Sequence, residues 1–350
     1  MNWTHGGDVA GFELEYGRMP LDFSASVSPW GMPEGARQAA ARAIDHAAAY
    51  PDPLCRKLRQ ALSDHLGVPA SYILCGNGAS DLIYRLCTAM RPKRGLVPVP
   101  TFSEYETALT MVGCSTERFR LNGQEDFSFT CEILSHITPD VDAVFLCNPN
   151  NPTGKTVPQT LLRQILGRCR ETGALLVLDE CFAELLDAPE NHTLLPELPG
   201  GGLLILRAFT KLYGMAGLRL GYCLASDDTL LQKMALSGPP WPVSSTAQAA
   251  GIAALEDGDY RRSLRGLLHT QRLVLAQGLS ALGLRVISGE ANFLLFYSRD
   301  TELGAKLRQK GVLLRDCRDF PGLGPGWYRT AVRTQQENQA LLAAIREVGP

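Results

Sequence analysis

The middle of the chain alternates between short apolar runs and longer segments with helical periodicity. Runs without polar alternation are typical of strands that are covered on both faces. The segment from Pro158 to Gly173 instead carries apolar residues three and four positions apart and ends at a glycine, which predicts a helix. Alternating strands and helices predict an α/β fold with a largely parallel sheet. The predicted strands are Gly95–Pro100, Asp142–Pro149, Ala174–Glu180, Leu203–Phe209 and Leu220–Ser226.

The pattern changes in the last third of the chain. Asp259–Gly283 predicts a long amphipathic helix, Ala291–Ser298 a strand, and Gln335–Val348 a final helix, which together indicate an α+β unit. The first ~35 residues are rich in Gly, Pro and Ser, and we expect them to form an extended arm. We therefore predict an arm over residues 1–35 that packs with the small domain, a large domain over 36–240, and a small domain over 241–350.

Composition narrows the class of protein. The 350 residues carry a net charge of −2 and no basic block, so we expect no nucleic-acid partner. No stretch approaches the ~20 apolar residues of a membrane helix, and the first residues do not resemble a signal peptide. The 10 cysteines form no C-x-x-C pair, and the 6 histidines show no metal spacing. These features predict a cytoplasmic protein with reduced thiols, no metal and no membrane partner.

Three polar motifs follow predicted strands, at the sheet edge where α/β proteins bind ligands. In "NPNNPTG", Asn151 either belongs to a simple turn or presents its amide to a ligand oxygen. In "LLVLDECF", Asp179 and Glu180 either begin a helix or supply a carboxylate to a protonated ring nitrogen. In "RAFTKLYGMAGLRLGY", Lys211 is either a surface lysine or a Schiff-base amine, with Arg219 as a phosphate ligand.

The spacing of these motifs favours the chemical interpretation. Asn151, Asp179 and Lys211 are separated by roughly 30 residues each, which fits one helical crossover plus a strand. An amide, a carboxylate, an amine and a cation are the groups that pyridoxal 5'-phosphate needs for its phenolic oxygen, ring nitrogen, aldehyde and phosphate. The order resembles the fold-type I pyridoxal-phosphate enzymes, in the aminotransferase class that includes histidinol-phosphate aminotransferase. This resemblance implies a large, mostly parallel, seven-stranded sheet that binds the cofactor.

The same resemblance assigns further cofactor contacts. "CGNGASDLI" is similar to the family's phosphate loop, and Phe102 of "PTFSEYE" stands where the family stacks an aromatic ring on the cofactor. Tyr50 of "AYPDP" matches a residue that reaches the cofactor phosphate of the partner subunit, which implies a homodimer. The implied cofactor-binding residues are Gly78, Ala79, Ser80, Phe102, Asn151, Asp179, Phe182, Thr210, Lys211, Arg219 and the partner's Tyr50, with Lys211 and Asp179 as the catalytic pair.

Segments near both ends resemble one branch of this family, the threonine-phosphate decarboxylases of the cobalamin pathway. They are "HGG" at His5–Gly7 and the stretches Leu21–Pro33, Pro239–Ala250 and Val312–Thr334. In that branch His5, Gly6, Gly7 and Arg315 would hold the substrate phosphate, Ser26 would line the substrate site, and Arg329 would hold the carboxylate. Phe182 stands where many aminotransferases have tyrosine, and the decarboxylase branch tends to have phenylalanine there.

The resemblance implies decarboxylation of an O-phospho-amino acid, with L-threonine O-3-phosphate converted to (R)-1-amino-2-propanol O-2-phosphate. An aminotransferase acting on histidinol phosphate or a similar amino-phosphate is the alternative, and a non-catalytic cofactor-binding protein is a second one. Ser26 and Ser244 replace asparagines usual in the family, which leaves serine phosphate open as a substrate. Ala208 replaces a Ser or Thr and removes one phosphate hydroxyl, and Cys181 replaces an alanine.

Overall fold

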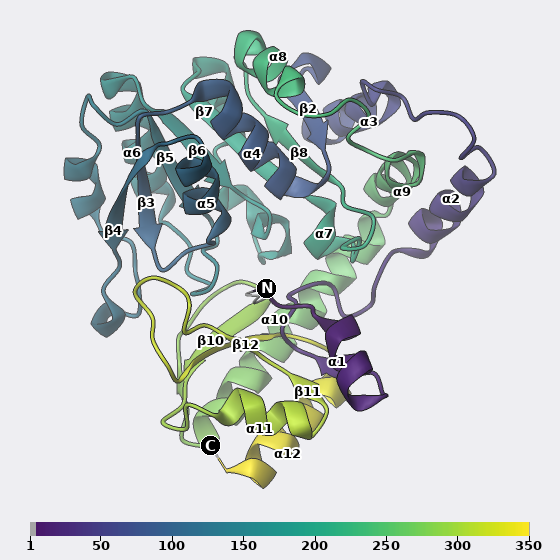
Figure 1. Ribbon diagram of the computed structural model, residues 1–350, viewed down its shortest axis with the longest axis vertical. Coiled ribbons are helices and arrows are strands. Elements are labelled where there is room, and N and C mark those ends of the chain that lie inside the picture. Colours follow the sequence, from purple (N-terminus) through teal and green to yellow (C-terminus); the bar gives the residue numbers. More distant parts are fainter. Residues whose placement is uncertain (1–4, 350) are drawn as a thin grey trace.

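A sheet of seven strands forms the centre of the larger domain of this protein (Figure 1), whose computed structural model describes residues 5–349. Its strand order is β2-β8-β7-β6-β5-β3-β4, and all neighbours are parallel except β8, which runs antiparallel to both β2 and β7. The strands are β2 Ile73–Gly76, β3 Arg94–Val99, β4 Ser115–Arg120, β5 Ala143–Cys147, β6 Leu175–Asp179, β7 Leu203–Ala208 and β8 Gly221–Leu224. The five strands predicted from apolar runs are all present, and β2 and β4 are additional.

Side chains that alternate along these strands enter two separate cores. Leu176 and Leu178 of β6 belong to the larger hydrophobic cluster, whereas Val177 between them belongs to the smaller one. Helices cover both faces, which explains why the strands read as continuous apolar runs. The helices of this domain are α2 Glu34–Ile44, α3 Arg56–Leu66, α4 Gly78–Met90, α5 Glu104–Met111, α6 Gln159–Thr172, α7 Phe209–Leu212, α8 Asp228–Leu236 and α9 Ser245–Glu256. Helix α9 packs against α2 and α3, so the large domain extends beyond the boundary predicted at residue 240.

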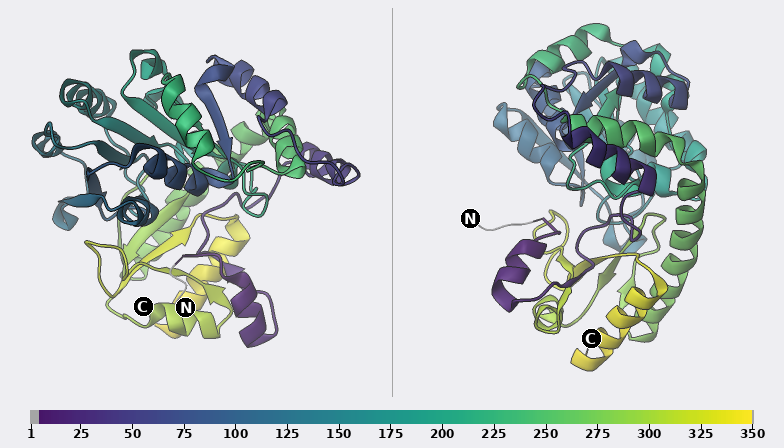
Figure 2. Two further views of the ribbon diagram at one scale, coloured as in Figure 1. Left: turned by 45° about the horizontal axis from the view of Figure 1, so that its top comes forward. Right: turned by 90° about the vertical axis from the view of Figure 1, so that its right-hand side faces the viewer.

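The smaller domain is built on a four-stranded sheet with the order β12-β13-β10-β9. The long helix α10 (Gly258–Ala281) runs from the large domain down one side of the small domain, as the right-hand view of Figure 2 shows. The other elements are β9 Arg285–Val286, β10 Phe293–Tyr297, α11 Leu303–Gln309, β11 Val312–Leu313, β12 Arg315–Asp316, β13 Trp327–Ala331 and α12 Gln335–Val348. The last helix has the bounds that the sequence predicts.

Residues 9–22 pack against the small domain through a helix and a strand. Strand β1 (Leu21–Asp22) pairs in parallel with β11, and helix α1 (Val9–Tyr16) lies beside the same domain (Figure 1). The helix corrects the expectation of a purely extended arm. Asp8 accepts a hydrogen bond from the N–H of Gly11, Gly17 closes the other end in the left-handed conformation, and Phe12 is fully buried.

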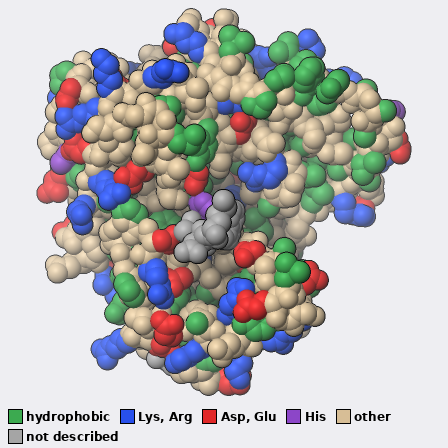
Figure 3. Space-filling view, viewed as in Figure 1, with side chains coloured by type: hydrophobic (Ala, Val, Ile, Leu, Met, Phe, Trp, Pro, Cys, Tyr) green, Lys and Arg blue, Asp and Glu red, His purple; other side chains and the backbone are tan. Residues whose placement is uncertain are grey.

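The outer surface presents charges of both signs. On the face shown in Figure 3, Lys and Arg side chains are interspersed with Asp and Glu over both domains. None of the helices within residues 5–349 combines the length and the apolar character needed to cross a bilayer.

Candidate active site

A cavity of about 590 Å³ opens between the two domains, at the edge where the chain leaves β5, β6 and β7. Parallel strands deliver their carboxyl ends to the same edge, which is why motifs far apart in sequence meet there. Both domains and the N-terminal segment contribute to the lining. The predicted site residues that line it are His5, Gly6, Ser26, Ala79, Ser80, Phe102, Asn151, Asp179, Phe182, Thr210, Lys211, Arg219, Arg315 and Arg329.

Three predicted site residues lie outside this lining. The N–H of Gly7 donates to the hydroxyl of Ser24 at 2.8 Å, so Gly7 contacts a residue that lines the cavity. Gly78 begins helix α4 with a φ of +78°, next to the lining residues that follow it. Tyr50 is 79% exposed, and its ring stacks on Trp241 with 4.4 Å between the ring centroids. Within one chain, therefore, Tyr50 does not reach the cavity.

Lys211 lies in the short helix α7, directly after the buried strand β7. Its amine is 5.3 Å from the centre of the Phe182 ring. Loss of hydration lowers the pKa of Lys211 to about 8, and the positive charges of Arg329 and Arg219 act in the same direction. A lysine with a lowered pKa holds a larger neutral, nucleophilic fraction near neutral pH, which is the condition for attack on a carbonyl.

Asp179 ends strand β6 and is 5% exposed, with its remaining surface in the cavity. One carboxylate oxygen accepts the hydroxyl of Tyr105 at 2.6 Å, and the other accepts the N–H of Cys181 at 2.9 Å. An ionised carboxylate has about four acceptor positions, so these two bonds leave capacity for a protonated ring nitrogen.

Glu180, the neighbour of Asp179, points to the opposite face of the sheet. Arg207 donates to its carboxylate at 2.7 and 3.0 Å, and the hydroxyl of Thr193 donates at 2.9 Å. Both members of the ion pair are almost fully buried. Alternation along the strand thus separates a carboxylate that faces the cavity from one that holds the fold together.

The start of helix α4 forms a cradle for an anion. The side chain of the N-cap residue Asn77 makes no cap hydrogen bond, and the only backbone N–H group that donates to Asp81 is that of Asn77. Among residues 5–349, therefore, no side chain occupies the N–H groups of Gly78, Ala79 and Ser80, which could bind a phosphate. A Cβ atom at Gly78 would come within 2.8 Å of the Arg219 guanidinium, so the helix start and this cation are in close contact. Thr210 adds a hydroxyl from the opposite wall.

Two arginines face the cavity from neighbouring strands of the small domain. Arg315 of β12 and Arg329 of β13 are directly paired in the antiparallel ladder, which places both side chains on the same face. Arg329 donates to the amide oxygen of Asn151 and, at 2.9 Å, to the carbonyl of Ser24. Arg315 is held by Asp319 at 2.8 Å. Asn151 therefore connects a large-domain loop to a small-domain cation.

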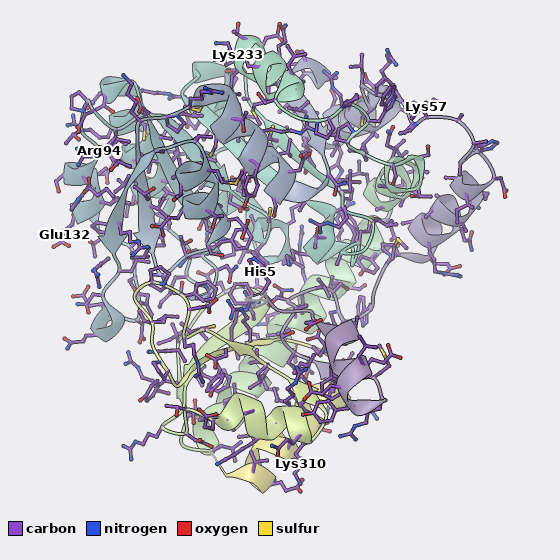
Figure 4. The ribbon with its side chains drawn as sticks, in the orientation of Figure 1. His5, Lys57, Arg94, Glu132, Lys233 and Lys310 are labelled. Atoms are coloured by element: carbon purple, nitrogen blue, oxygen red, sulfur yellow. The ribbon has the colours of Figure 1, made fainter. Side chains whose placement is uncertain are left out.

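His5 joins the N-terminal segment to the large domain. Its Nε2 lies 3.0 Å from Oε1 of Glu104. The other carboxylate oxygen of Glu104 accepts a hydrogen bond from the hydroxyl of Tyr84 at 2.6 Å. The hydrogen bond from His5 is the main cause that lowers the pKa of Glu104. Figure 4 shows His5 at the junction of the two domains.

The departures from the family pattern take different places. The hydroxyl of Ser26 is buried and has no hydrogen-bond partner among the described residues, while Ala208 and Cys181 line the cavity without a hydroxyl. Ser244 lies outside this cavity, where its hydroxyl caps helix α9 by accepting the N–H of Ala247.

Sequence reasoning missed several lining residues, among them Ser24, Glu104, Tyr105 and Phe320. Glu104 and Tyr105 belong to the quoted motif "PTFSEYE", in which we assigned a role to Phe102 alone. Their place at the first turn of a helix after a strand end was the available signal.

Pyridoxal 5'-phosphate fits the residues present. Lys211 would supply the amine, Asp179 the carboxylate for the ring nitrogen, and Asn151 the amide for the phenolic oxygen. The uncapped start of α4 beside Arg219 suits the phosphate, because free N–H groups and a guanidinium both favour an anion. The structural observation that supports this fit is the close approach at Gly78, where φ is +78° and a Cβ atom would collide with the Arg219 guanidinium.

Fold and site together define a pyridoxal-phosphate-dependent enzyme of fold type I. Residues 18–345 match the family described as Aminotransferase class I and II, and the chain belongs to that family. The chain is 37% identical to threonine-phosphate decarboxylase of Salmonella typhimurium over 99% of this chain and 97% of that protein. It is 33% identical to histidinol-phosphate aminotransferase 1 of Cupriavidus pinatubonensis, over 93% of this chain and 87% of that protein.

Two solved structures share the fold over nearly the whole chain. Histidinol-phosphate aminotransferase from Clostridium acetobutylicum aligns with a TM-score of 0.87 and 27% identity, over 93% of this chain and 98% of that one. L-threonine-O-3-phosphate decarboxylase from Porphyromonas gingivalis aligns with a TM-score of 0.81 and 25% identity, with the same two coverages.

The lowered pKa of Lys211 predicts how cofactor capture depends on pH. The rate at which the cofactor-free protein binds pyridoxal phosphate covalently should rise with pH and be half-maximal near pH 8, because the neutral amine predominates above the pKa of about 8. Rapid mixing followed by visible absorbance measures this rate. In Arg329→Met the midpoint should move up, because that cation lowers the pKa. A wild-type midpoint near ~10.4, the value of a free lysine, would contradict the prediction.

Proposed function

We propose that the protein decarboxylates L-threonine O-3-phosphate to (R)-1-amino-2-propanol O-2-phosphate. The observation that carries this proposal is the pairing of Arg315 and Arg329 over the same cavity as Lys211. A phospho-amino acid carries two anions, a carboxylate and a phosphate, and a site with two guanidinium groups can bind one with each. The similarity to proteins named threonine-phosphate decarboxylase supports the same substrate.

We assign the carboxylate to Arg329 and the phosphate to Arg315 together with His5. Arg329 is 7% exposed and donates to Asn151, a proposed cofactor contact, whereas Arg315 and His5 line the same cavity without a hydrogen bond to a proposed cofactor contact among the described residues. Holding the substrate at both ends fixes the rotation of its central carbon, and this rotation decides which bond lies in position to break.

Pyridoxal phosphate, when bound, withdraws electrons from the breaking bond at the substrate α-carbon. Asp179 favours that withdrawal by holding a proton on the ring nitrogen. Lys211 is the proton carrier closest to the reaction, and with a pKa of about 8 its amine can both accept and donate a proton near neutral pH. In the overall reaction the carboxylate leaves as carbon dioxide and one proton takes its place on the α-carbon.

Transamination of histidinol phosphate or a similar amino-phosphate is the second candidate. It is favoured by the similarity to proteins and solved structures of that name. Histidinol phosphate has a phosphate and no carboxylate, so it would engage only one of the two arginines itself.

The substrate assay separates the two candidates. Holoenzyme incubated with L-threonine phosphate should release carbon dioxide without any 2-oxo acid. Threonine without phosphate should react at least about tenfold more slowly, because it loses one charge-assisted hydrogen bond to the protein. Arg315→Met should abolish this preference for the phosphate. Strict dependence on 2-oxoglutarate would overturn the decarboxylase proposal in favour of transamination.

We also infer a homodimer in which Tyr50 contributes to the partner's active site. Tyr50 and Trp241 form an exposed aromatic pair, and Leu54 nearby in sequence is 53% exposed. Exposed aromatic and aliphatic side chains of this kind favour a subunit interface.

The free, mostly buried cysteines suit the reducing conditions of the cytoplasm, where we expect the enzyme to act.

Mixing two inactive variants tests the shared site. Tyr50→Ala and Lys211→Ala dimers should each have low activity, but dissociated and reassembled together they should regain it, because each mixed dimer contains one site with both residues intact. Activity after co-refolding, with size-exclusion chromatography, measures this. If the mixture stays inactive while mixed dimers form, Tyr50 acts within its own chain, and full activity of Tyr50→Ala dimers alone would show that Tyr50 has no role.

A further inference from the structure

We propose that Tyr105 is a positioning residue that holds Asp179 as an ionised, oriented acceptor for the ring nitrogen of the cofactor. This inference rests on the cofactor assignment proposed above and not on which reaction follows. Tyr105 is 1% exposed, and its hydroxyl donates to Asp179 at 2.6 Å. Hydrogen bonds to an ionised carboxylate are about twice as strong as neutral ones.

The ring of Tyr105 is fixed by its neighbours. It stacks on Phe145 of β5 with centroids 5.4 Å apart, and it meets the edge of Phe102 at 5.5 Å and 82°. Phe102 is the residue that we expect to lie against the cofactor ring. Tyr105, in the first turn of α5, therefore contacts both Phe102 and the carboxylate of Asp179.

The surroundings of Asp179 make this hydrogen bond important. The other side-chain groups with ionisable character that face it are the thiols of Cys147 and Cys181 and the amine of Lys211. Burial raises the pKa of both thiols, so they stay protonated and carry no charge. Tyr105 therefore donates to Asp179 beside the N–H and the thiol of Cys181, and it is the hydroxyl donor, at 2.6 Å.

Tyr105 itself stays in the form that donates. Burial raises the pKa of its hydroxyl well above the ordinary value, and the negative charge of Asp179 acts in the same direction. The proton remains on the phenol oxygen throughout the pH range in which the enzyme works. Without this hydroxyl, the carboxylate of Asp179 loses a hydrogen-bond donor and is less firmly oriented, so it would hold the proton on the ring nitrogen less well.

The test uses holoenzyme loaded with cofactor that carries an isotopic label at the ring nitrogen, observed by nitrogen NMR without substrate. Wild type should show the resonance of a protonated ring. In Tyr105→Phe the resonance should move toward that of a neutral ring at the same pH. Turnover should fall roughly tenfold to a hundredfold with little change in KM, because the anion-binding residues are untouched. An unchanged resonance and unchanged turnover would overturn the proposal.

Two comparisons separate positioning from general destabilisation. Tyr328→Phe removes another buried hydroxyl, which lies outside the cavity lining and donates to the carbonyl of Thr301 at 2.7 Å. This control substitution should leave the ring-nitrogen resonance unchanged. In an Asp179→Asn background, Tyr105→Phe should have little additional effect, because it acts through that carboxylate. If wild type itself shows a neutral ring, the assignment of Asp179 fails and not only the role of Tyr105.

Discussion

Replacing Lys211 by alanine should abolish the visible absorption band of the cofactor-loaded protein and reduce turnover at least about a thousandfold. The amine is the group that forms the covalent link, and no other lysine lines the cavity among the described residues. Absorbance spectroscopy and mass spectrometry of the borohydride-treated protein measure the loss directly. In wild type, reduction should fix the cofactor to the peptide that contains Lys211.

Lys233→Ala is the matched control for this substitution. Lys233 is exposed on α8, at the far end of the large domain from His5 (Figure 4), so its removal should change neither the band nor the turnover. A cofactor that borohydride still fixes to the protein in Lys211→Ala would show that another amine forms the link.

Replacing Arg207 by methionine should lower the free energy of unfolding by about 3–5 kcal/mol. The substitution leaves Glu180 buried as a charge whose cation is gone, and the hydroxyl of Thr193 and the N–H of Leu194 compensate only part of the loss. Urea titration of the cofactor-free protein, followed by fluorescence at a fixed protein concentration, measures the change.

The double substitution Arg207→Met with Glu180→Leu should recover most of this loss, since no unpaired charge remains. An exposed pair provides the comparison. Arg37→Met removes the partner of Glu34 on the surface of α2, and the urea midpoint should stay close to that of wild type. If Arg207→Met and Arg37→Met have the same small effect, the buried pair does not stabilise the fold as we infer.

Much of the fold could be predicted because strands covered on both faces leave continuous apolar runs. Lys211 and Asp179 were identifiable for the same reason, since each follows such a run directly. Strand β4 was missed because its position at the edge of the sheet leaves most of its side chains at least partly exposed. The helix α1 was missed because only eight residues separate its two capping signals, Asp8 and Gly17.

The parts of the site that were not predicted depend on pairing between distant segments. The register that aligns Arg315 with Arg329 is set by β12 and β13 and is not visible in the spacing of the two residues. The contact between Tyr105 and Asp179 joins a helix to a strand 74 residues away. Ser244, which replaces an asparagine usual in the family, caps helix α9, a local role that the comparison with the family did not predict.

The antiparallel direction of β8 has an evolutionary consequence. Because β8 returns beside β7, the chain turns back at one edge of the sheet, so the proposed cofactor amine and phosphate ligand, Lys211 and Arg219, lie on a single short connection. The two arginines that we assign to the substrate stand on a different sheet in the other domain. Mutations at Arg315 can therefore change substrate preference with little effect on the cofactor site, whereas Arg329 also hydrogen-bonds to Asn151 and lowers the pKa of Lys211. That separation explains how one ancestral scaffold can diversify into lineages with different reactions.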